Sequence, residues 1–193
     1  MIDGLVHPAE GELPLSDLEI GVHVLQLMAA ATDSTAGLLT NLLYELLSDR
    51  SRWNRLLDDT SLIPVAIEES LRHDAPLQYV LRTVTMEQEI SGRMISPGHR
   101  LVVSLQSANW DEQVWGADAA EYSLDRPPGQ APTMAFGYGV HTCLGAPLAR
   151  LEARVVLEEL LARFPGMRLA TGYHRDPAPS VMLRRPARLS VVL

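Results

Sequence analysis

The chain has 193 residues, which is enough for one domain with a buried core. Apolar residues make up 47% of it, and this composition excludes an intrinsically disordered protein. The formal net charge of −8 argues against a nucleic-acid-binding surface, because proteins that bind phosphate backbones are normally basic.

The cysteine count and the start of the chain indicate the compartment. Cys143 is the single cysteine, so no internal disulfide can form, which favours the reducing cytoplasm. Residues 1–10 lack the positive start and apolar run of a signal peptide. The longest apolar stretch, 24–31, is too short to cross a bilayer. We therefore expect a cytoplasmic protein with no membrane or nucleic-acid partner.

Residues 16–49 are predicted to form one long helix. Ser16 and Glu19 have the spacing of a capping box, and apolar residues follow at helical intervals. Four hydrogen-bonding side chains stand in a row over 32–35, in the middle of this helix. Serine and threonine can bond back to the helix backbone and bend it, so a purely structural role is one interpretation of these four residues.

The middle of the chain alternates between short elements. A polar helix is predicted over 50–57, and a second helix over 64–73 begins at Pro64. Alternating side chains between 77 and 107 indicate strands. The segment 116–132 is rich in proline, glycine and charge, which is typical of an irregular loop. The fold class that these elements predict is mainly α with small β-sheets.

A second strong helix is predicted over 146–164, where Pro165 and Gly166 end it. Short strands are predicted over 168–193. The apolar face of the helix is predicted to consist of Leu148, Leu151, Val155, Val156 and Leu160.

Cys143 lies in a glycine-rich segment immediately before this second helix. A lone cysteine is usually a small buried hydrophobic residue. Here Gly137, Gly139 and Gly145 surround it, and glycines let the backbone pass close to a bulky flat group. The N–H groups and dipole at the start of a helix favour a thiolate, and a thiolate is a suitable ligand for iron. The pattern therefore makes Cys143 a candidate iron ligand.

Residues 136–145 read Phe-Gly-Tyr-Gly-Val-His-Thr-Cys-Leu-Gly. They resemble the heme-binding loop of the cytochrome P450 family, Phe-Gly-x-Gly-x-His-x-Cys-x-Gly, at every fixed position. The resemblance, to members of the soluble bacterial type, implies the carboxy-terminal heme-binding half of the P450 fold, with heme b (iron protoporphyrin IX) as cofactor. It implies that Cys143 binds the iron within a loop that covers 134–145. The other cofactor contacts that it implies in this loop are Phe136, Gly137, Gly139, His141 and Gly145.

Glu69 and Arg72 resemble the Glu-x-x-Arg pair of the same family. On a helix, residues three apart share a face and can pair, so an exposed salt bridge is the simpler interpretation of this spacing. In the family the pair is buried and bound to an arginine in the loop before the cysteine, a place that Arg126 occupies. The resemblance implies that these three residues hold the Cys143 loop in place.

Two further side chains are implied to contact the heme. Arg82 occupies the position of an arginine that pairs with a heme propionate, because a guanidinium bonds a carboxylate in a fork. His141 is implied to serve the second propionate. Taken singly, they would be a solvated strand residue and a loop histidine. The implied substrate-pocket positions are Leu77, Gln78, Val80, Val181 and Met182.

The long helix resembles the oxygen-activating helix of the family. Residues 30–35 read Ala-Ala-Thr-Asp-Ser-Thr, where the family has Ala-Gly-x-Asp/Glu-Thr-Thr, so Ala31 and Ser34 depart from the pattern. An acid beside an alcohol can relay protons to dioxygen. The resemblance therefore implies a catalytic role for Asp33, Ser34 and Thr35, with Ala30 against the cofactor.

The resemblance covers nearly the whole chain but about half of the family fold, so residues 1–193 are expected to form a single truncated P450-like domain. Large apolar faces are expected to be exposed. Three explanations compete. The chain is a fragment or has a mis-assigned internal start, it is a shortened copy, or it is a heme binder that a partner chain or a dimer completes.

The implied function is a heme-thiolate monooxygenase, whether a fragment or a truncated form. It would insert one oxygen atom from O2 into a small apolar substrate, with electrons from NAD(P)H that a ferredoxin or flavoprotein delivers. The alternative is a non-catalytic heme-binding or partner-completed interaction domain. Arg150 and Arg154 are candidates for a basic docking patch for the electron donor, and a solvated helix face is the other interpretation.

Overall fold

The computed structural model describes residues 2–7, 11, 13–127 and 129–193. Within these ranges helices dominate, and the strands form three two-stranded antiparallel sheets. The predicted fold class, mainly α with small β-sheets, is confirmed. The α-helices are α1 (Ile2–Val6), α2 (Asp17–Ser48), α3 (Arg50–Asp58), α4 (Ile63–His73), α5 (Leu105–Asn109), α6 (Glu112–Trp115) and α7 (Ala146–Arg163). The 3-10 helices are η1 (Thr60–Leu62), η2 (Met134–Phe136) and η3 (Gly139–His141). The strands are β1 (Tyr79–Thr83), β2 (Gln88–Ile90), β3 (Arg93–Ile95), β4 (Arg100–Ser104), β5 (Arg168–Leu169) and β6 (Val191–Val192).

Helix α2 begins as its sequence predicts. The Ser16 hydroxyl accepts a hydrogen bond from the Glu19 N–H, and the Glu19 carboxylate accepts one from the Ser16 N–H at 2.8 Å. Each side chain thereby satisfies a backbone donor that the helix itself leaves free. The helix runs unbroken to Ser48, so the polar residues in its middle do not interrupt it.

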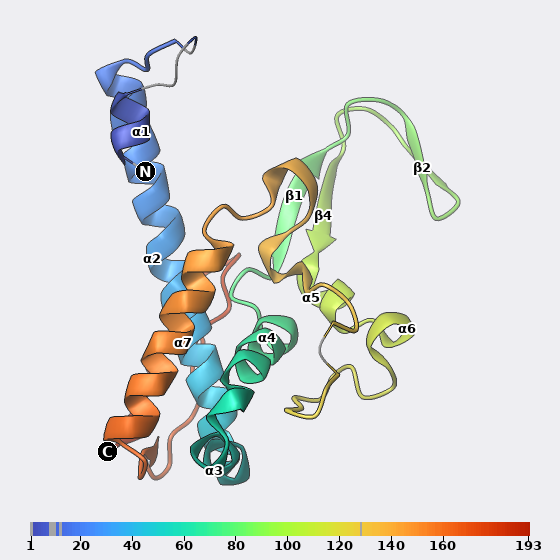
Figure 1. The fold of residues 1–193 in the computed structure, drawn as a ribbon. Coiled ribbons are helices and arrows are strands. Elements are labelled where there is room, and N and C mark those ends of the chain that lie inside the picture. The colour runs from blue at the N-terminus through green and yellow to red at the C-terminus, as the bar shows by residue number, and fades with distance from the viewer. Residues whose placement is uncertain (1, 8–10, 12, 128) are drawn as a thin grey trace.

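The hydrophobic core lies between the second half of α2, α3, α4 and the inner face of α7. Figure 1 shows α7 running along α2, with α3 and α4 beside them. The side chains of Leu42, Leu46, Trp53 and Leu157 are fully buried there. The helices predicted over 50–57 and 64–73 are α3 and α4, and Pro64 stands in the first turn of α4 as expected.

The predicted buried face of α7 is partly wrong. Leu148, Leu151 and Val155 are exposed, whereas Leu157 and Leu161 are buried. The reason is that α7 carries apolar side chains on two faces, and the described part of the chain packs against only one of them. Periodicity alone cannot say which of two apolar faces meets the core.

The strands predicted between 77 and 107 are confirmed as far as Ser104. Strands β1 and β4 pair in antiparallel register, with Leu81 opposite Val102. After Ser104 the prediction is wrong, because residues 105–109 form α5. The Ser104 side chain caps this helix by accepting a hydrogen bond from the Ser107 N–H.

The segment predicted as a loop over 116–132 contains no helix or strand in its described residues, and Pro128 lies outside them. In the amino-terminal segment 1–14, residues 1, 8–10 and 12 likewise lie outside the described residues, and α1 was not predicted. Short strands form in the tail as expected, where β5 pairs with β6. Among the described residues, no helix combines the length and apolar character needed to cross a membrane.

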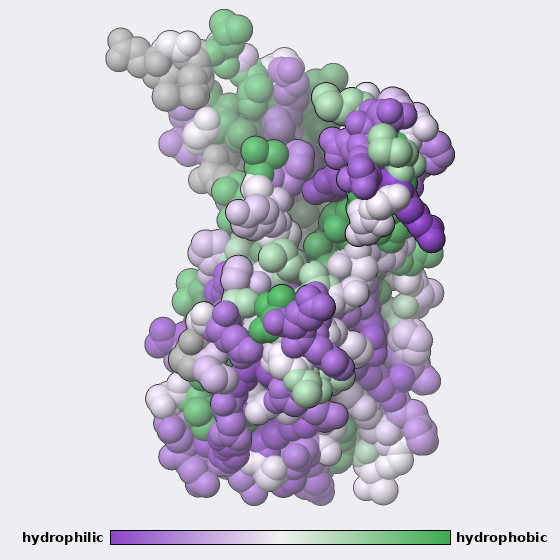
Figure 2. Space-filling model, turned by 90° about the vertical axis from the view of Figure 1, so that its right-hand side faces the viewer, coloured by the Kyte–Doolittle hydropathy of each residue, from purple (hydrophilic) through white to green (hydrophobic). Residues whose placement is uncertain are grey.

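The molecule exposes more surface than its mass leads one to expect. Its accessible surface is 12421 Å², against about 9,100 Å² for a compact monomer of the same mass. Figure 2 shows hydrophobic side chains among those on the surface. The expectation of exposed apolar faces is thus confirmed. On α2 and α7 these side chains are Leu18, Val22, Leu25, Met28, Leu148, Leu151 and Val155.

Candidate functional site

The segment 134–145, called here the Cys143 loop, is shaped by its own backbone. The Cys143 N–H donates to the Phe136 carbonyl at 2.9 Å, which closes the loop on itself. Gly137 and Gly139 have φ angles of 70° and 79°, in the left-handed region that side chains other than glycine rarely adopt. The backbone of the loop therefore requires glycine at both positions, whatever it binds.

The Cys143 side chain is exposed. It is therefore not a buried core cysteine. Two apolar neighbours are exposed with it, and Val140 is 98% accessible. A thiol among exposed apolar side chains, immediately before α7, suits a large apolar ligand that carries a metal bound by thiolate, such as iron.

The two predicted propionate partners are also exposed. Arg82 lies on β1, and its guanidinium donates to the Leu81 carbonyl at 2.9 Å. Within the described part of the chain it forms no ion pair with a carboxylate. His141 closes η3, two residues before Cys143. Both side chains thus remain available to an anionic group of a ligand.

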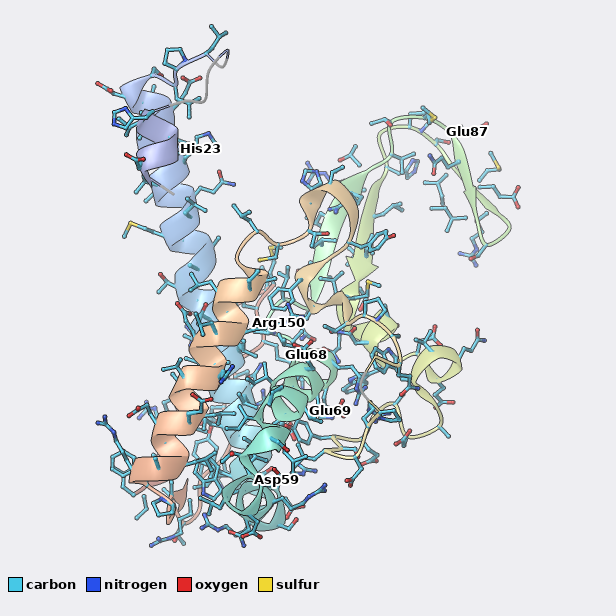
Figure 3. All side chains as sticks on the ribbon, in the orientation of Figure 1. His23, Asp59, Glu68, Glu69, Glu87 and Arg150 are labelled. Carbon is cyan, nitrogen blue, oxygen red and sulfur yellow. The ribbon has the colours of Figure 1, made fainter. Side chains whose placement is uncertain are left out.

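The basic patch predicted from Arg150 and Arg154 is neutralised by neighbouring glutamates. Arg150 donates to Glu68 at 2.5 Å, and its guanidinium lies 4.6 Å from the centre of the Phe136 ring. Figure 3 labels Arg150 on α7 and Glu68 on α4. The hydrogen bond to Glu68 raises the pKa of Arg150, although partial burial opposes it. Arg154 pairs with Glu158 at 2.7 Å. This region is better described as a set of ion pairs, one of which anchors the Cys143 loop to α4 and α7.

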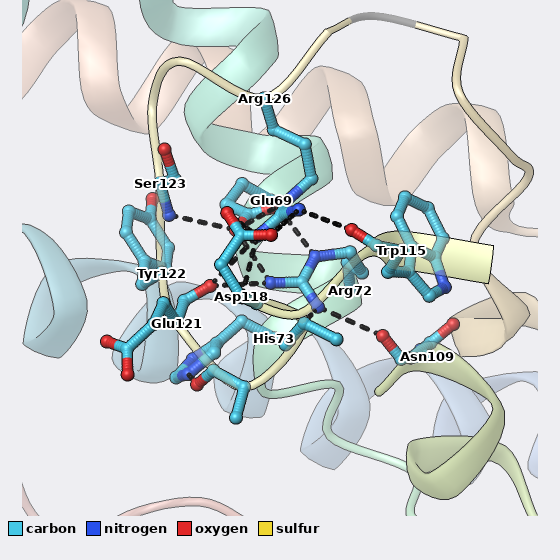
Figure 4. A network of polar contacts seen from close by, with 12 residues as sticks. Glu69, Arg72, His73, Asn109, Trp115, Asp118, Glu121, Tyr122, Ser123 and Arg126 are labelled. Atoms are coloured by element: carbon cyan, nitrogen blue, oxygen red, sulfur yellow. Dashed lines mark hydrogen bonds and ion pairs between the residues drawn. The ribbon is translucent and has the colours of Figure 1, made fainter. Parts of the chain in front are cut away.

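Glu69, Arg72 and Arg126 form a buried cluster, named here the Glu69 cluster (Figure 4). The Arg72 guanidinium donates two hydrogen bonds of 2.8 Å to the Glu69 carboxylate, and the Arg126 Nε lies 3.2 Å from the same carboxylate. Glu69 is 3% exposed and Arg72 is 1% exposed. The interpretation of Glu69 and Arg72 as an exposed salt bridge is wrong, and the buried pair expected from the resemblance is present.

A continuous path of hydrogen bonds joins this cluster to the Cys143 loop. The Arg72 guanidinium donates to the Asn109 carbonyl at 2.9 Å. The Asn109 side chain accepts from the Met134 N–H at 2.7 Å. Met134 begins η2, which ends at Phe136, the residue whose carbonyl receives the Cys143 N–H. Sequence reasoning missed the role of Asn109, because nothing in a lone asparagine signals that it will be buried.

The residues predicted to relay protons lie on α2, and Asp33 among them also pairs with the tail of the chain. The Ser34 hydroxyl donates to the Ala30 carbonyl at 2.6 Å. Asp33 is 60% exposed on its side chain and pairs with Arg185 of the tail at 3.2 Å. Thr35 is half-buried. Arg185 was not predicted, and only the tertiary structure brings it to α2.

An open cavity of about 410 Å³ lies between the tail and Gln78, the residue before β1. Its lining includes Gln78, Val181 and Met182, three of the five predicted pocket residues, whereas Leu77 and Val80 do not line it. The Gln78 N–H donates to the Met182 carbonyl at 3.1 Å, which fixes the tail turn against the strand. The structure thus brings together two segments that lie about a hundred residues apart in the chain.

Comparison with known proteins places these features in a family context. The family model described as cytochrome P450 matches residues 55–179. The steroid C26-monooxygenase of Mycolicibacterium smegmatis is 35% identical over 178 residues, which are 92% of this chain and 44% of that protein. The nocardicin C N-oxygenase of Nocardia uniformis is 39% identical over 181 residues, 92% of this chain and 44% of that protein.

Solved structures give the same result. A crystal structure of CYP109E1 from Bacillus megaterium in complex with testosterone matches with a TM-score of 0.90 at 33% identity, over 97% of this chain and 51% of that one. P450BioI in complex with a ligated acyl carrier protein matches with a TM-score of 0.87 at 29% identity, over 97% of this chain and 49% of that one. The chain therefore spans about half the length of the relatives it matches.

Proposed function

The chain belongs to the cytochrome P450 family, and from this premise we propose that it supplies the heme-binding half of a heme-thiolate monooxygenase. The observation that carries the proposal is the Cys143 loop. It meets every fixed position of the family pattern, it exposes its thiol, and the path through Asn109 ties it to the Glu69 cluster. No other described part of the chain offers a soft metal ligand in such a setting.

The residues fit the family cofactor, heme. Cys143 would hold the iron as a thiolate, and Arg82 and His141 would bind the propionates. The left-handed glycines of the loop leave no side chain beside the backbone at these two positions. When bound, the heme supplies the activation of dioxygen, and the thiolate ligand is the feature of the chain that favours it.

The proposed proton relay uses Asp33, Ser34 and Thr35 on α2. The Ser34 hydroxyl donates to the Ala30 carbonyl, so its lone pairs stay free to receive a proton. The Arg185 guanidinium holds the Asp33 carboxylate close to the same turn of the helix. Protons would pass from solvent to Asp33 and then through the two hydroxyls.

The substrate and partner assignments follow from the family. The named relatives include steroid monooxygenases, and we propose a small apolar substrate for this protein as well. Electrons would come from NAD(P)H through a ferredoxin or flavoprotein. A cytoplasmic location is part of the proposal, supported by the single, unpaired cysteine.

Carbon-monoxide difference spectroscopy of the reduced, heme-loaded chain tests the ligand. We expect the red-shifted band of a thiolate-bound heme for the native chain and its loss in Cys143→Ser. Thr142→Ala, a change at the neighbouring exposed residue, should keep the band. A folded, heme-loaded native chain without this band would refute the assignment of Cys143.

The second candidate, a heme-binding domain that a partner completes, is favoured by one observation, the exposed surface of 12421 Å². Turnover with a surrogate reductase separates the two candidates. Oxidation of a substrate that depends on NAD(P)H supports the monooxygenase. Heme binding without such turnover, across a broad panel of apolar substrates, supports the partner-completed domain.

A further inference from the structure

The segment 118–122 has an unusual way of satisfying its backbone. It contains no regular element, and all five of its carbonyl groups lie at hydrogen-bond distance from an arginine or histidine side chain. Carbonyls outside helices and sheets need other partners, and here side chains supply most of them, beside one backbone hydrogen bond from the Glu121 N–H to the Asp118 carbonyl at 2.9 Å. Side chains therefore help to set the shape of this segment. The donors for residues 118 to 122 in order are Arg126, Arg72, His73, Arg72 with Arg126, and Arg52.

The four donors fall into two groups, each built around a buried carboxylate. Glu69 holds Arg72 and Arg126, as described above. Glu45, on α2 and 7% exposed, lies 3.1 Å from the Arg52 Nη1 and 3.5 Å from the His73 Nδ1. Burial by itself would raise the pKa of Glu45, but His73 first, and then the Arg52 and Arg175 charges, outweigh it and lower the pKa. The neighbours of Glu45 therefore stabilise its ionised form.

His73 connects this second group to the rest of the site. Its Nε2 lies 3.0 Å from the Ala120 carbonyl, which can only accept, so the ring donates there. The ring lies between two aromatic side chains, with centroids 5.6 Å from Trp110 and 5.7 Å from Tyr122. The Trp110 indole in turn donates to the His73 carbonyl at 2.9 Å. Trp110 directly follows Asn109, which bonds the start of the Cys143 loop.

We propose that Glu45 and His73 are positioning residues that act as a second anchor for the 118–122 segment, and through it for the Cys143 loop. This role is separate from that of Glu69 and Arg72. It rests on the proposed function only in that the loop is taken to be the heme-binding one. Glu45 orients the His73 ring, and the ring fixes Ala120 and the Trp110 side chain at once.

Two amide groups report the position of these segments without any heme. The Ser123 N–H donates to Glu69 at 2.9 Å, and the Met134 N–H donates to the Asn109 side chain. Hydrogen exchange of the full 193-residue chain, followed in peptides over 118–126 and 131–143, measures both. His73→Phe keeps a flat ring but loses the donor. We expect both amides to exchange roughly tenfold faster in this variant, because the Ala120 carbonyl loses its hydrogen bond from the ring. Amides inside α3 should not change.

Three further variants make the test specific. His73→Gln keeps a donor and should restore most of the protection. His99→Gln is the matched control, because His99 is exposed and also contacts a carbonyl, that of Ser96, at 3.0 Å. Glu45→Gln should raise exchange at the same two amides, and Glu45→Gln combined with His73→Phe should add little to His73→Phe alone, because the two residues act as one unit.

A uniform rise in exchange across the core of α3 and α4 in His73→Phe would show a merely structural role and overturn the proposal. So would an effect no larger than that of His99→Gln. If His73→Phe does not fold, Glu45→Gln provides the same test. A rise in exchange confined to the two amides supports the proposal, and a uniform rise across α3 and α4 overturns it. Because the experiment needs no heme, its outcome is independent of the carbon-monoxide spectrum. The Glu45–His73 anchor can therefore be refuted while the Cys143 assignment stands, and the reverse.

Discussion

At the scale of single residues, Arg72 has the largest share of buried polar contacts near the candidate site. It binds the Glu69 carboxylate in a fork and also donates to the carbonyls of Asn109, Ala119 and Glu121. A buried pair of this kind adds little net stability over apolar residues, but the loss of one partner leaves a buried charge uncompensated. Arg72 therefore acts mainly by holding these carbonyl groups in position, and its ion pair adds little to the net stability.

Arg72→Leu should lower the free energy of unfolding by about 3–5 kcal/mol, because Glu69 would remain buried without its main partner. Urea unfolding, followed by tryptophan fluorescence, measures the change. Arg163→Leu is the matched control. It breaks the exposed pair with Glu159 and should cost no more than about 1 kcal/mol. Equal losses in the two variants would contradict the burial argument.

A single residue, Glu45, also affects how the free energy of unfolding depends on pH in acid. The pKa of Glu45 is lower in the folded chain than its ordinary value because of His73, Arg52 and Arg175, although burial opposes them. Its contribution to stability is therefore fully present above the ordinary glutamate value of about 4.3, and it is lost as the pH falls through the lower folded value.

Glu45→Gln should accordingly be less stable than the native chain at pH 6 to 7, and the difference should shrink as the pH falls below about 4.3. Unfolding free energies over this pH range measure it. Glu68→Gln serves as the control, because Glu68 is exposed in its pair with Arg150. A difference between Glu45→Gln and the native chain that stays constant down to pH 3 would show that another interaction accounts for the loss.

At the scale of elements, the Cys143 loop and α7 form one unit. Loop residues with positive φ angles turn the chain so that Cys143 stands one turn before α7, and Ala146 donates to the Cys143 carbonyl at 3.3 Å. Two of the three fixed glycines in the pattern are thereby explained without reference to any ligand. The third, Gly145, has a φ angle of −81° and needs no glycine for its backbone.

Gly139→Ala should destabilise the chain by about 1–2 kcal/mol, because alanine is strained at a φ angle in the left-handed region. Gly145→Ala should be close to neutral in the chain without heme, since its φ angle is ordinary and an added Cβ would meet Cys143 Sγ at 3.8 Å, an ordinary contact. Thermal unfolding of the two variants side by side gives the comparison. A loss in Gly145→Ala as large as in Gly139→Ala would remove the backbone explanation.

At the scale of the whole molecule, the dominant feature is apolar surface that the described chain leaves uncovered. The core around Leu42, Leu46 and Trp53 is complete, but the first half of α2 and the outer face of α7 have few contacts. A helix of this length is stabilised mainly by the packing of its apolar face, so the exposed half of α2 gains little from the rest of the fold.

The two faces of α7 should respond to mutation in opposite ways. Leu157→Ala, on the buried face, should lower the free energy of unfolding by about 2–5 kcal/mol. Leu148→Glu with Leu151→Glu, on the exposed face, should leave it within about 0.5 kcal/mol per substitution and should reduce the fluorescence of a bound apolar dye. A strong loss of stability in the double variant would mean that the exposed face is covered in solution.

Sequence by itself determined the glycine-rich turns of the Cys143 loop, the capped start of α2 and the positions of the main helices. These features are local, since a turn, a cap or a motif depends on residues near one another in the chain. Spacing also raised the possibility that Glu69 and Arg72 pair. The resemblance, and not the spacing, indicated that they are buried.

Only the tertiary structure decided which face of α7 enters the core, and that Asn109, Glu45, His73 and Arg185 meet the elements they hold. Each of these depends on contacts between segments far apart in the chain, and a side chain carries no local signal of a distant partner. Packing chooses one of two apolar faces, and burial turns an ordinary asparagine, glutamate or histidine into an anchor. The Cys143 loop could be read from ten consecutive residues, whereas its support comes from side chains spread from residue 45 to residue 126.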